Sequence, residues 1–370
     1  MQLTKLQIGF CMECGVCTGS CPISYERDHF SPRQMIKRTL VDPDPDILQS
    51  RDLWACLSCS RCSDRCPVGI DFPAFITSYR QKARKAENLP RQSHHGIFQT
   101  LTTIQAGNLQ QSRTSWASEA GIIRERGDYF LFVGCLPFQN AVFHYLDLQM
   151  IDIARAALIL LNKLGIEPVV SDNERCCGHD AFWTGDDTLF AICARKNIET
   201  IRASGAKTVL FICPEGYSIF KEQYPRIVGE LPFRMVHLTE WLSEALAEKP
   251  LEFSKSTEGT ITFHDPCRLG RRAGIYDQPR SLLQMVPDTR YAEMENNREN
   301  AVCCGTTAWL ECSSCSKAMQ VSRLKEAERA GADTMITACP KCQIHLSCAK
   351  SNTDIDVEIV DLYSYLAGKL

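Results

Sequence analysis

The sequence predicts a multidomain protein in which a mostly α-helical N-terminal domain precedes two tandem α/β repeats. Three observations lead to this fold class. Two cysteine-dense runs occupy the first 66 residues, apolar strand-like runs alternate with helical segments from residue 128 onward, and this second pattern occurs twice. We expect a first domain at 1–90, a linker at 91–127, and repeats at 128–250 and 260–370.

Cysteine is the residue type that stands out in the composition. The chain has 370 residues, a formal net charge of −3 and 44% hydrophobic residues, which is ordinary for a globular protein. The 21 cysteines are far more than a hydrophobic core requires. No apolar leader follows Met1, so we expect thiols that are reduced in a cytosol and bound to metal. The near-neutral charge gives no reason to expect a nucleic-acid partner.

No long, uninterrupted apolar segment suggests a membrane span. The best candidate, residues 150–166, contains Asp152, Arg155 and Lys163. We therefore interpret it as an amphipathic core helix. The expected location is cytoplasmic, with any membrane association made through a partner.

Both N-terminal cysteine runs have the spacing C-x-x-C-x-x-C-x-x-x-C-P, which is typical of bacterial two-cluster ferredoxins. Three thiolates at i, i+3 and i+6 can wrap one cubane [4Fe–4S] cluster, while the chain carries the fourth cysteine to the other cluster. This argument assigns one cluster to Cys11, Cys14, Cys17 and Cys66, and the other to Cys56, Cys59, Cys62 and Cys21. A pair of zinc sites is the alternative, but eight cysteines in two matching runs favour iron–sulfur clusters.

The segment between the two runs is predicted to be helical. Ser31-Pro32 and Asp42-Pro43 have the pattern of helix starts, with proline at the first helical position, and a further helix is expected from Pro73 to Lys85. Cys21 and Cys56 are 35 positions apart, since 56 − 21 = 35. This domain resembles the all-helical ferredoxin modules of succinate dehydrogenase and heterodisulfide reductase.

The rest of the chain contains an internal duplication. Apolar runs such as Tyr129–Val133 and Thr208–Ile212 alternate with helical segments, as expected for α/β units. Cys213-Pro214 and Cys339-Pro340 are 126 positions apart, as are Gly205-Ala206 and Gly331-Ala332. Matching cysteines, glycines and apolar runs at one offset predict two copies of one unit.

Each copy carries its own set of cysteines. The second copy has Cys267, Cys303, Cys304, Cys339 and Cys342, and the first has Cys135, Cys176, Cys177 and Cys213. Gly216 stands where the second copy has Cys342, because 342 − 216 = 126. Adjacent cysteines are poor disulfide partners for one another. Since each cysteine follows a predicted strand or opens a helix, each set is expected to gather at one end of its sheet.

The segment His264 to Arg271, the Cys-Cys-Gly triplets and Cys339-Pro340-Lys341-Cys342 resemble the cysteine-rich CCG domain of the B-type subunit of heterodisulfide reductase. The whole chain resembles the fused, D-type subunit, and the iron–sulfur subunits of glycolate oxidase and anaerobic glycerol-3-phosphate dehydrogenase. The resemblance implies that the five cysteines of the second copy hold a noncubane [4Fe–4S] cluster that cleaves a disulfide. The four thiols of the first copy could hold a cubane cluster or zinc, or the site could be empty.

Two functions follow as hypotheses. In the first, electrons relayed through the ferredoxin clusters reduce a small-molecule disulfide, or two thiols are oxidised, at the second copy. In the second, the chain only transfers electrons between a flavin dehydrogenase and a quinone or other acceptor. The chain has no Gly-rich dinucleotide motif, so both hypotheses require a partner, expected to be a flavin-containing iron–sulfur subunit. A hydrogenase, a dehydrogenase and a membrane cytochrome subunit are further candidate partners.

Several other residues allow two interpretations. Cys312 and Cys315 form a C-x-x-C pair that is either redox-active or simply the start of a helix, and we favour the second reading. Three arginines could stabilise cluster thiolates or an anionic substrate, or form a solvated basic turn. Three histidines near cluster cysteines could donate protons or be structural. These residues are Arg268, Arg271, Arg272, His179, His264 and His345; Cys193 and Cys348 are expected in the core.

Overall fold

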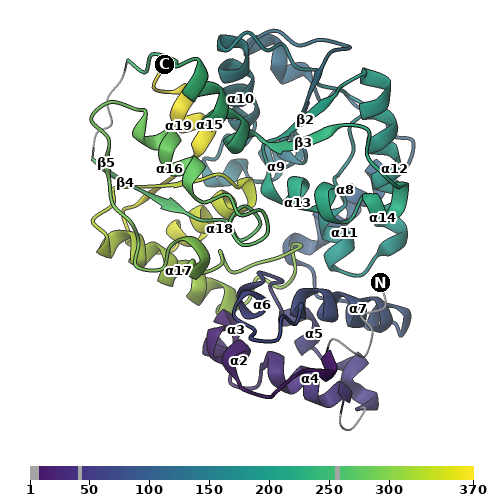
Figure 1. Ribbon diagram of the computed structural model, residues 1–370. Helices are drawn as coiled ribbons and strands as arrows, with labels where there is room; N and C mark the ends of the chain where they lie inside the picture. Colours follow the sequence, from purple (N-terminus) through teal and green to yellow (C-terminus); the bar gives the residue numbers. More distant parts are fainter. Residues whose placement is uncertain (1–7, 41–43, 255–258) are drawn as a thin grey trace.

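The N-terminal cysteine runs lie in a domain of short helices. The computed structural model describes residues 8–40, 44–254 and 259–370, and the expected helix start at Pro43 falls outside these ranges. The helices of this domain are α2 (Val16–Ser20), α3 (Pro22–Glu26), α4 (Pro32–Leu40), α5 (Asp52–Ala55), α6 (Arg61–Asp64) and α7 (Phe72–Lys85), with a 3₁₀ helix at Pro45–Gln49. They form the purple and dark-blue domain beneath the two repeats in Figure 1.

Local signals explain where the two longest of these helices begin. The Ser31 hydroxyl accepts a hydrogen bond from the Gln34 amide at the start of α4. The Asp71 carboxylate accepts one from the Ala74 amide at the start of α7. Each helix also has proline in its first turn, where a missing N–H group costs nothing.

Residues 91–127 carry more structure than their polar composition indicates. They contain α8 (Ile97–Ala106) and 3₁₀ helices at Ser93–Gly96 and Ser115–Glu119. The buried Phe98 ring stacks on Trp309 of the second repeat with ring centroids 4.2 Å apart. The segment therefore connects distant parts of the chain by packing against both repeats.

The first repeat is a parallel sheet flanked by helices. Its strands are β1 (Tyr129–Phe132), β2 (Thr208–Phe211) and β3 (Arg234–His237), in the order β1-β2-β3. Val169 adds an isolated bridge beside Phe130 on the free side of β1. The helices are α9 (Leu136–Val142), α10 (Asp152–Lys163), α11 (His179–Trp183), α12 (Asp187–Ser204), α13 (Pro214–Glu222), α14 (Pro225–Val228) and α15 (Leu238–Glu248), with a 3₁₀ helix at His144–Leu146.

The second repeat has the same arrangement with one more strand. Its parallel sheet has the order β5-β4-β6-β7, in which Phe263 pairs with Ile336 and Ile336 with Val360. The strands are β4 (Thr260–His264), β5 (Arg290–Tyr291), β6 (Thr334–Thr337) and β7 (Glu358–Asp361). The helices are α16 (Asp277–Gln284), α17 (Ser314–Arg329), α18 (Pro340–Lys350) and α19 (Leu362–Ala367), with a 3₁₀ helix at Arg298–Asn300.

The two repeats pack side by side (Figure 1), and the helix contacts between them have pseudo-two-fold symmetry. Helix α10 packs on α19, and α15 packs on α16, so each repeat offers corresponding helices to the other. Thr239 and Tyr363, which begin corresponding helices, share a hydrogen bond of 3.0 Å between their hydroxyls. The predicted order of a helical cysteine-rich domain and two α/β repeats is thus confirmed.

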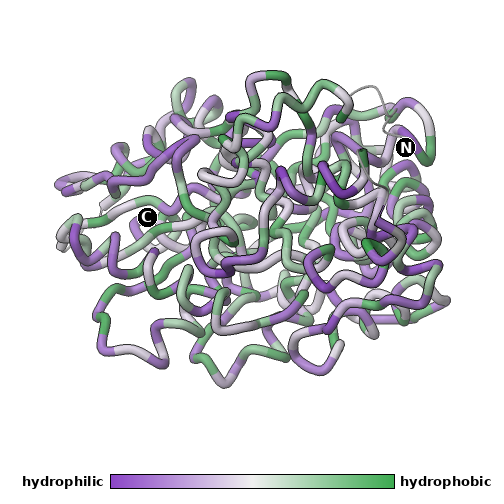
Figure 2. The backbone as a smooth tube through the Cα atoms, turned by 90° about the horizontal axis from the view of Figure 1, so that it is seen from below, coloured by the Kyte–Doolittle hydropathy of each residue, from purple (hydrophilic) through white to green (hydrophobic). Residues whose placement is uncertain are grey.

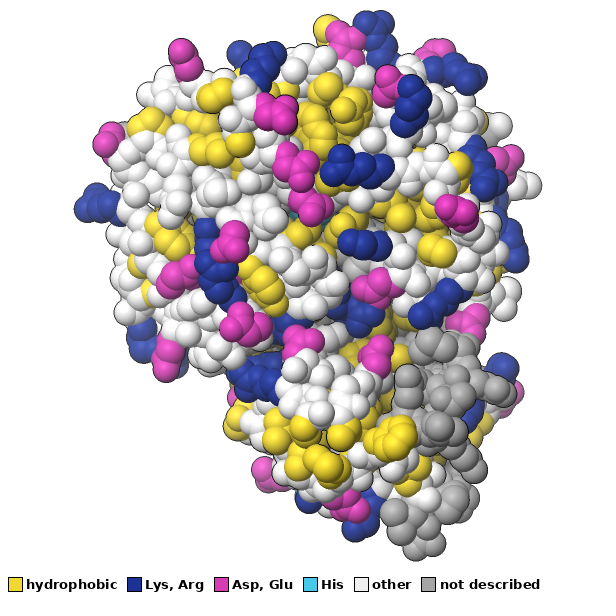
Figure 3. Space-filling view, in the orientation of Figure 1, with side chains coloured by type: hydrophobic (Ala, Val, Ile, Leu, Met, Phe, Trp, Pro, Cys, Tyr) yellow, Lys and Arg dark blue, Asp and Glu magenta, His cyan; other side chains and the backbone are white. Residues whose placement is uncertain are grey.

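Apolar and polar residues alternate along the chain rather than forming long blocks (Figure 2). Helix α10, within the membrane-span candidate, buries Ile153, Ala157 and Leu161 and keeps Lys163 at its polar end. Among the described residues, none of the helices has the length and apolar character needed to cross a bilayer. Acidic and basic side chains are interspersed over the face shown in Figure 3.

Candidate iron–sulfur sites

The N-terminal cysteines converge on two neighbouring cavities. One is lined by Cys11, Cys14, Cys17, Cys62 and Cys66. The other is lined by Cys21, Cys56, Cys59 and Cys62. The structure therefore brings together both sets of four that the spacing predicted, including the exchange of Cys21 and Cys66, with Cys62 between the cavities.

The two cavities differ in their access to solvent. Cys14, at the first cavity, is exposed, whereas the four cysteines of the second cavity are all buried. Burial, reinforced by the charge of Cys59, raises the pKa of Cys21 to about 12. A group of thiols becomes thiolates in such surroundings when a cation replaces the protons, so this donor set fits an iron–sulfur cluster. The first cavity is thus the more solvent-accessible of the two.

The five predicted cysteines of the second repeat gather at the carboxyl end of its sheet. Cys267 follows β4, Cys339 follows β6, and the pair Cys303-Cys304 lies in the loop before α17. Their side chains form one continuous series of contacts in the order Cys267, Cys303, Cys304, Cys342, Cys339. A five-thiol donor set of this kind fits an iron–sulfur cluster.

Glycine is required after this cysteine pair. Gly305 has a φ of 85°, and a Cβ added to it would lie 2.7 Å from the backbone oxygen of Ser316. The turn therefore needs a residue that adopts a left-handed conformation and has no side chain. Gly178, after the cysteine pair of the first repeat, has a φ of 75° and a similarly close neighbour in Phe190.

The first repeat presents fewer thiols to its own site. Cys135 contacts Cys176, which contacts Cys177. Cys213, by contrast, contacts Cys339 of the second repeat. These two cysteines occupy corresponding positions, so the pseudo-two-fold axis passes between them and the two sites adjoin there.

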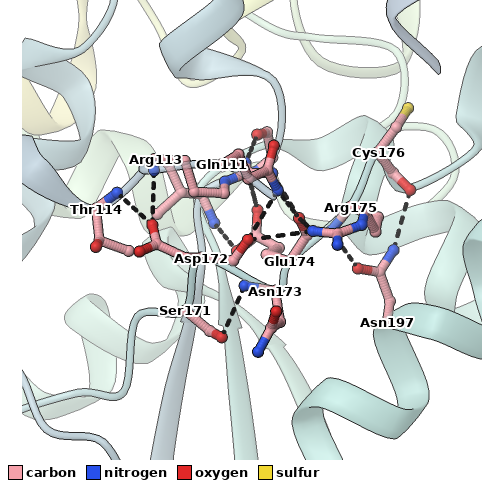
Figure 4. A network of polar contacts seen from close by, with 12 residues as sticks. Gln111, Arg113, Thr114, Ser171, Asp172, Asn173, Glu174, Arg175, Cys176 and Asn197 are labelled. Atoms are coloured by element: carbon pink, nitrogen blue, oxygen red, sulfur yellow. Dashed lines mark hydrogen bonds and ion pairs between the residues drawn. The ribbon is translucent and has the colours of Figure 1, made fainter. Parts of the chain in front are cut away.

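A buried polar network holds the cysteine loop of the first repeat (Figure 4). The Glu174 carboxylate accepts hydrogen bonds from the Val133 and Gly134 amides and pairs with Arg113 at 2.9 Å. Burial raises the pKa of Glu174 to about 7, although Arg113 and both amides oppose the shift. Arg113 belongs to the segment predicted as a linker, so that segment helps to build the first site.

A second buried network lies between the two sites. The Lys341 ammonium is 2.6 Å from Glu215 and 2.8 Å from Asp180, both of the first repeat. Burial alone would lower the pKa of Lys341, but these two carboxylates raise it well above its ordinary value. His179 donates through Nδ1 to Asp180 and accepts at Nε2 from Arg268, at 2.9 and 3.3 Å. Both ring nitrogens of His179 are therefore hydrogen-bonded.

Sequence reasoning missed this charge cluster, although the sequence holds a signal for it. The Cys-Pro pair of each repeat is followed by a charged residue, Glu215 in the first repeat and Lys341 in the second. Opposite charges at corresponding positions of a duplication can pair across its symmetry axis when the two repeats face each other at those positions. The same cluster, His179 with Asp180 and Glu215, has the ligand types of a metal site, but the Lys341 ammonium already supplies its cation.

The three arginines after Cys267 face the ferredoxin domain rather than solvent. Arg268 donates to the Ser58 carbonyl and hydroxyl, and Arg271 donates to the Cys59 carbonyl at 2.7 Å. Arg272 donates to the Ser60 hydroxyl at 3.2 Å. The interpretation as a solvated basic turn is therefore wrong, and the loop around the second cavity lies directly against the second repeat.

The remaining candidates have separate surroundings. Cys312 is exposed and lies near Tyr145. Cys315, at the start of α17, lies near Glu26 and Arg27. The two thiols thus have different neighbours, which supports the structural reading of this pair. Cys193 is fully buried, as expected for a core residue.

Cys348, the other cysteine expected in the core, is only partly buried, and its sulfur is 3.0 Å from the Lys317 ammonium. The other two candidate histidines, His264 and His345, are buried. Nδ1 of His264 accepts from Arg323 at 3.1 Å, which leaves Nε2 to carry the proton. The His345 ring packs near Trp309, with centroids 5.0 Å apart.

Comparison with known protein families agrees with this architecture. The model of the cysteine-rich CCG domain matches residues 129–221 and 261–347, and that of the 4Fe-4S dicluster domain matches 7–70. The chain is 29% identical to the D-type subunit of the dihydromethanophenazine:CoB–CoM heterodisulfide reductase of Methanosarcina acetivorans, over 99% of this chain and 94% of that protein. The chain thus belongs to the proteins that combine a 4Fe-4S dicluster domain with two cysteine-rich CCG domains, and it is similar to D-type heterodisulfide reductase subunits over nearly its whole length.

Other relatives of the chain are named for different reactions. The EtfAB:quinone oxidoreductase of Syntrophomonas wolfei is 27% identical over 91% of this chain, which spans 54% of that protein. The B-type subunit of the fumarate reductase (CoM/CoB) of Methanothermobacter marburgensis is 25% identical over 96% of this chain and 71% of its own length. The relatives are thus named for three different oxidoreductase reactions.

A solved structure of a hypothetical protein from Helicobacter pylori has the same fold. It superposes with a TM-score of 0.55 at 13% identity, over 91% of this chain and 66% of that one. The likeness extends the architecture to a distant sequence and concerns the fold alone.

Proposed function

We propose that this chain is the iron–sulfur subunit of a heterodisulfide-reductase-like complex, whose second repeat reduces a small-molecule disulfide or oxidises two thiols. The observation that carries the proposal is the series of five contacting thiols, from Cys267 to Cys342, placed directly against the loop of the second ferredoxin cavity. A noncubane [4Fe–4S] cluster there would supply one-electron transfer and iron that binds sulfur. The eight N-terminal cysteines would hold two cubane clusters.

The chain's own residues organise this site for electron transfer. Arg268 and Arg271 fix the distance between the second ferredoxin cavity and the second repeat by donating to backbone oxygens of Ser58 and Cys59. Electrons would enter at the exposed side, beside Cys14, because the other cavity is buried. We also propose that the ferredoxin domain spans residues 1–90 and that the two repeats span 128–250 and 260–370. Residues 91–127 would link the first two of these domains.

The first repeat has a different role in this proposal. A cubane cluster held by Cys135, Cys176, Cys177 and Cys213 is the first choice, with zinc or an empty site as alternatives. Gly216, where the second repeat has Cys342, supports an asymmetric pair of sites, since the contact of Cys213 with Cys339 is common to both repeats. Substrate chemistry is accordingly assigned to the second repeat alone.

A partner must supply or remove the electrons. A flavin-containing iron–sulfur subunit fits this need best, because the chain lacks a dinucleotide motif. A hydrogenase, a dehydrogenase or a membrane cytochrome could occupy the same place in the complex. The complex is proposed to be cytoplasmic, or held at a membrane by such a partner.

The test is Cys342→Ala in protein purified without oxygen, with Cys348→Ala on the same helix as the matched control. Cys342→Ala is expected to abolish one paramagnetic signal and disulfide reduction by reduced dyes, while both ferredoxin signals remain. Iron should be about twelve to sixteen atoms per chain in the parent protein, at four per cluster. About eight irons, or survival of every signal in Cys342→Ala, would contradict the proposal.

The second candidate function is electron transfer without substrate chemistry. The missing fifth cysteine at Gly216 favours it, and an EtfAB:quinone oxidoreductase is among the relatives. No turnover of any disulfide by a chain that carries its full iron, together with electron transfer from a reduced flavoprotein to a quinone-reducing partner, would establish this alternative.

A further inference from the structure

Arg271 is placed between two groups of cysteines that belong to different domains. Its Nε donates to the Cys59 carbonyl of the ferredoxin domain at 2.7 Å. Its Nη1 donates to the Ala301 carbonyl at 2.8 Å, two residues before the Cys303-Cys304 pair. The backbone contacts on both sides fix the guanidinium at the boundary between the second ferredoxin cavity and the second repeat.

The acidic groups that act on the charge of Arg271 are cysteines of both domains, together with Tyr276 and Asp64. Among the described residues, no carboxylate forms an ion pair with it. Burial alone would lower the pKa of Arg271, but Cys59, Cys267 and Cys303 together raise it. Its Nη2 is buried and has no hydrogen-bond partner among the described residues. An arginine cannot lose its proton, so this positive charge is permanent.

The two neighbouring arginines are engaged differently. Arg272 forms an ion pair with Glu222, with 2.9 Å between Nε and Oε1, so its charge is largely cancelled. Arg268 shares its donors between Ser58 and His179, and its guanidinium lies 4.4 Å from the centre of the Trp183 ring. Arg268 acts on Cys56 and Cys267, and Arg271 acts on Cys59, Cys267 and Cys303, so Arg271 is the one of the three that also acts on the Cys303-Cys304 pair.

The duplication provides an internal comparison. Aligned on Cys135 and Cys267, the position of Arg271 corresponds to Gln139, since 271 − 139 = 267 − 135 = 132. The first repeat thus has an uncharged residue where the second has a partly buried cation. The charge is present only in the repeat whose cysteine loop contacts the ferredoxin domain through this turn.

We propose that Arg271 raises the reduction potentials of the iron–sulfur groups on both sides of it, relative to the group at Cys11, Cys14, Cys17 and Cys66. Reduction adds negative charge to a cluster, and a fixed cation nearby favours the reduced form. This bias moves electrons from the exposed cavity inward to the second repeat. The inference rests on the proposed function only in that it requires clusters at these sites.

The test compares Arg271→Gln, Arg271→Lys and Arg272→Gln in the complete, cluster-loaded chain. Potentiometric titrations followed by electron paramagnetic resonance give the potential of each cluster, and Cys14→Ala and Cys342→Ala assign the signals. Arg271→Gln is expected to lower the potentials of the two clusters next to it and to leave the exposed cluster unchanged. Arg271→Lys should leave the potentials of these two clusters close to those of the parent. Arg272→Gln should change them little, because Glu222 already balances the charge of Arg272.

Two results would overturn the inference. One is an unchanged potential in Arg271→Gln at full iron content, and the other is an equal fall at all clusters, which indicates a general loosening. If Arg271→Gln does not retain its clusters, Arg271→Lys becomes the deciding variant, because it keeps the positive charge and loses the planar guanidinium. Cluster potentials near those of the parent in Arg271→Lys support the inference. A fall in these potentials contradicts it. Absence of any cluster at the second repeat of the parent protein would instead refute the proposed function.

Discussion

Glu215 and Lys341 occupy corresponding positions in the two repeats and form an ion pair with each other, with 2.6 Å between Oε2 and Nζ. Each follows a Cys-Pro pair that caps a helix, so the duplication places them on either side of the pseudo-two-fold axis. Asp180 also pairs with Lys341, at 2.8 Å. One buried cation thus joins the cysteine loops of the two sites.

Replacing Lys341 with methionine is expected to destabilise the protein strongly. The change leaves Glu215 and Asp180 buried without their cation, which costs about 3–5 kcal/mol for a buried ion pair. Glu215→Gln should cost less, because Lys341 keeps Asp180. Urea unfolding of the cluster-loaded protein checks this order, and equal midpoints for Lys341→Met and the parent would contradict it.

The stability of the protein should fall as the pH rises from about 6.5 to 8. Burial raises the pKa of Asp361 to about 8, against the Tyr363 and Ser364 amides, while burial lowers the pKa of His237 to about 3. The raised pKa of Asp361 stabilises the folded state fully at a pH below 3.8, the ordinary pKa of the group. This contribution is lost progressively as the pH rises from 3.8 to about 8. The lowered pKa of His237 makes the protein more stable as the pH rises from about 3 to 6.5. Below pH 6.5 this gain offsets the loss of stability that Asp361 causes.

Above pH 6.5 only Asp361 of this pair contributes, with a loss of up to about 1.4 kcal/mol per pH unit. Asp361→Asn removes the part of the slope that Asp361 causes, leaves the part that the raised pKa of Glu174 causes up to about pH 7, and keeps the oxygen that accepts from the Tyr363 amide. Unfolding midpoints at pH 6.5, 7.2 and 8.0, compared between the parent and this variant, measure the difference. The same slope in both proteins would show that Asp361 is not the titrating group.

The spacing of cysteines predicted the local parts of the sites well. The exchange of Cys21 and Cys66 between the two cavities follows from geometry that depends on a few residues along the chain. The duplication likewise predicted two similar sheets, because strand and helix patterns are local. Whether these thiols carry the proposed clusters stays a prediction.

Long-range contacts were not accessible from the sequence in the same way. Phe98 stacks on Trp309, which lies 309 − 98 = 211 positions away, so the segment around Phe98 had no local signal that it packs in the interior. The pair of Glu215 and Lys341 depends on how the two repeats face each other, and an offset of 126 positions does not reveal that orientation. Contacts of this kind are set by tertiary packing rather than by local propensity.

Gly216→Cys should complete the ligand set of the first repeat. A Cβ added to Gly216 would meet only ordinary contacts, 3.6 Å from Phe211 and 3.9 Å from the Cβ of Cys177, so a side chain fits and lies beside the site. The variant is expected to gain up to about four irons per chain if the first site of the parent is empty. If that site already holds a cluster, the iron content stays constant and its spectrum changes toward that of the second repeat. Gly216→Ser, with nearly the same volume and no thiol, is the matched control, and the same iron content and spectrum in both variants would show that a fifth thiol is not what distinguishes the two sites.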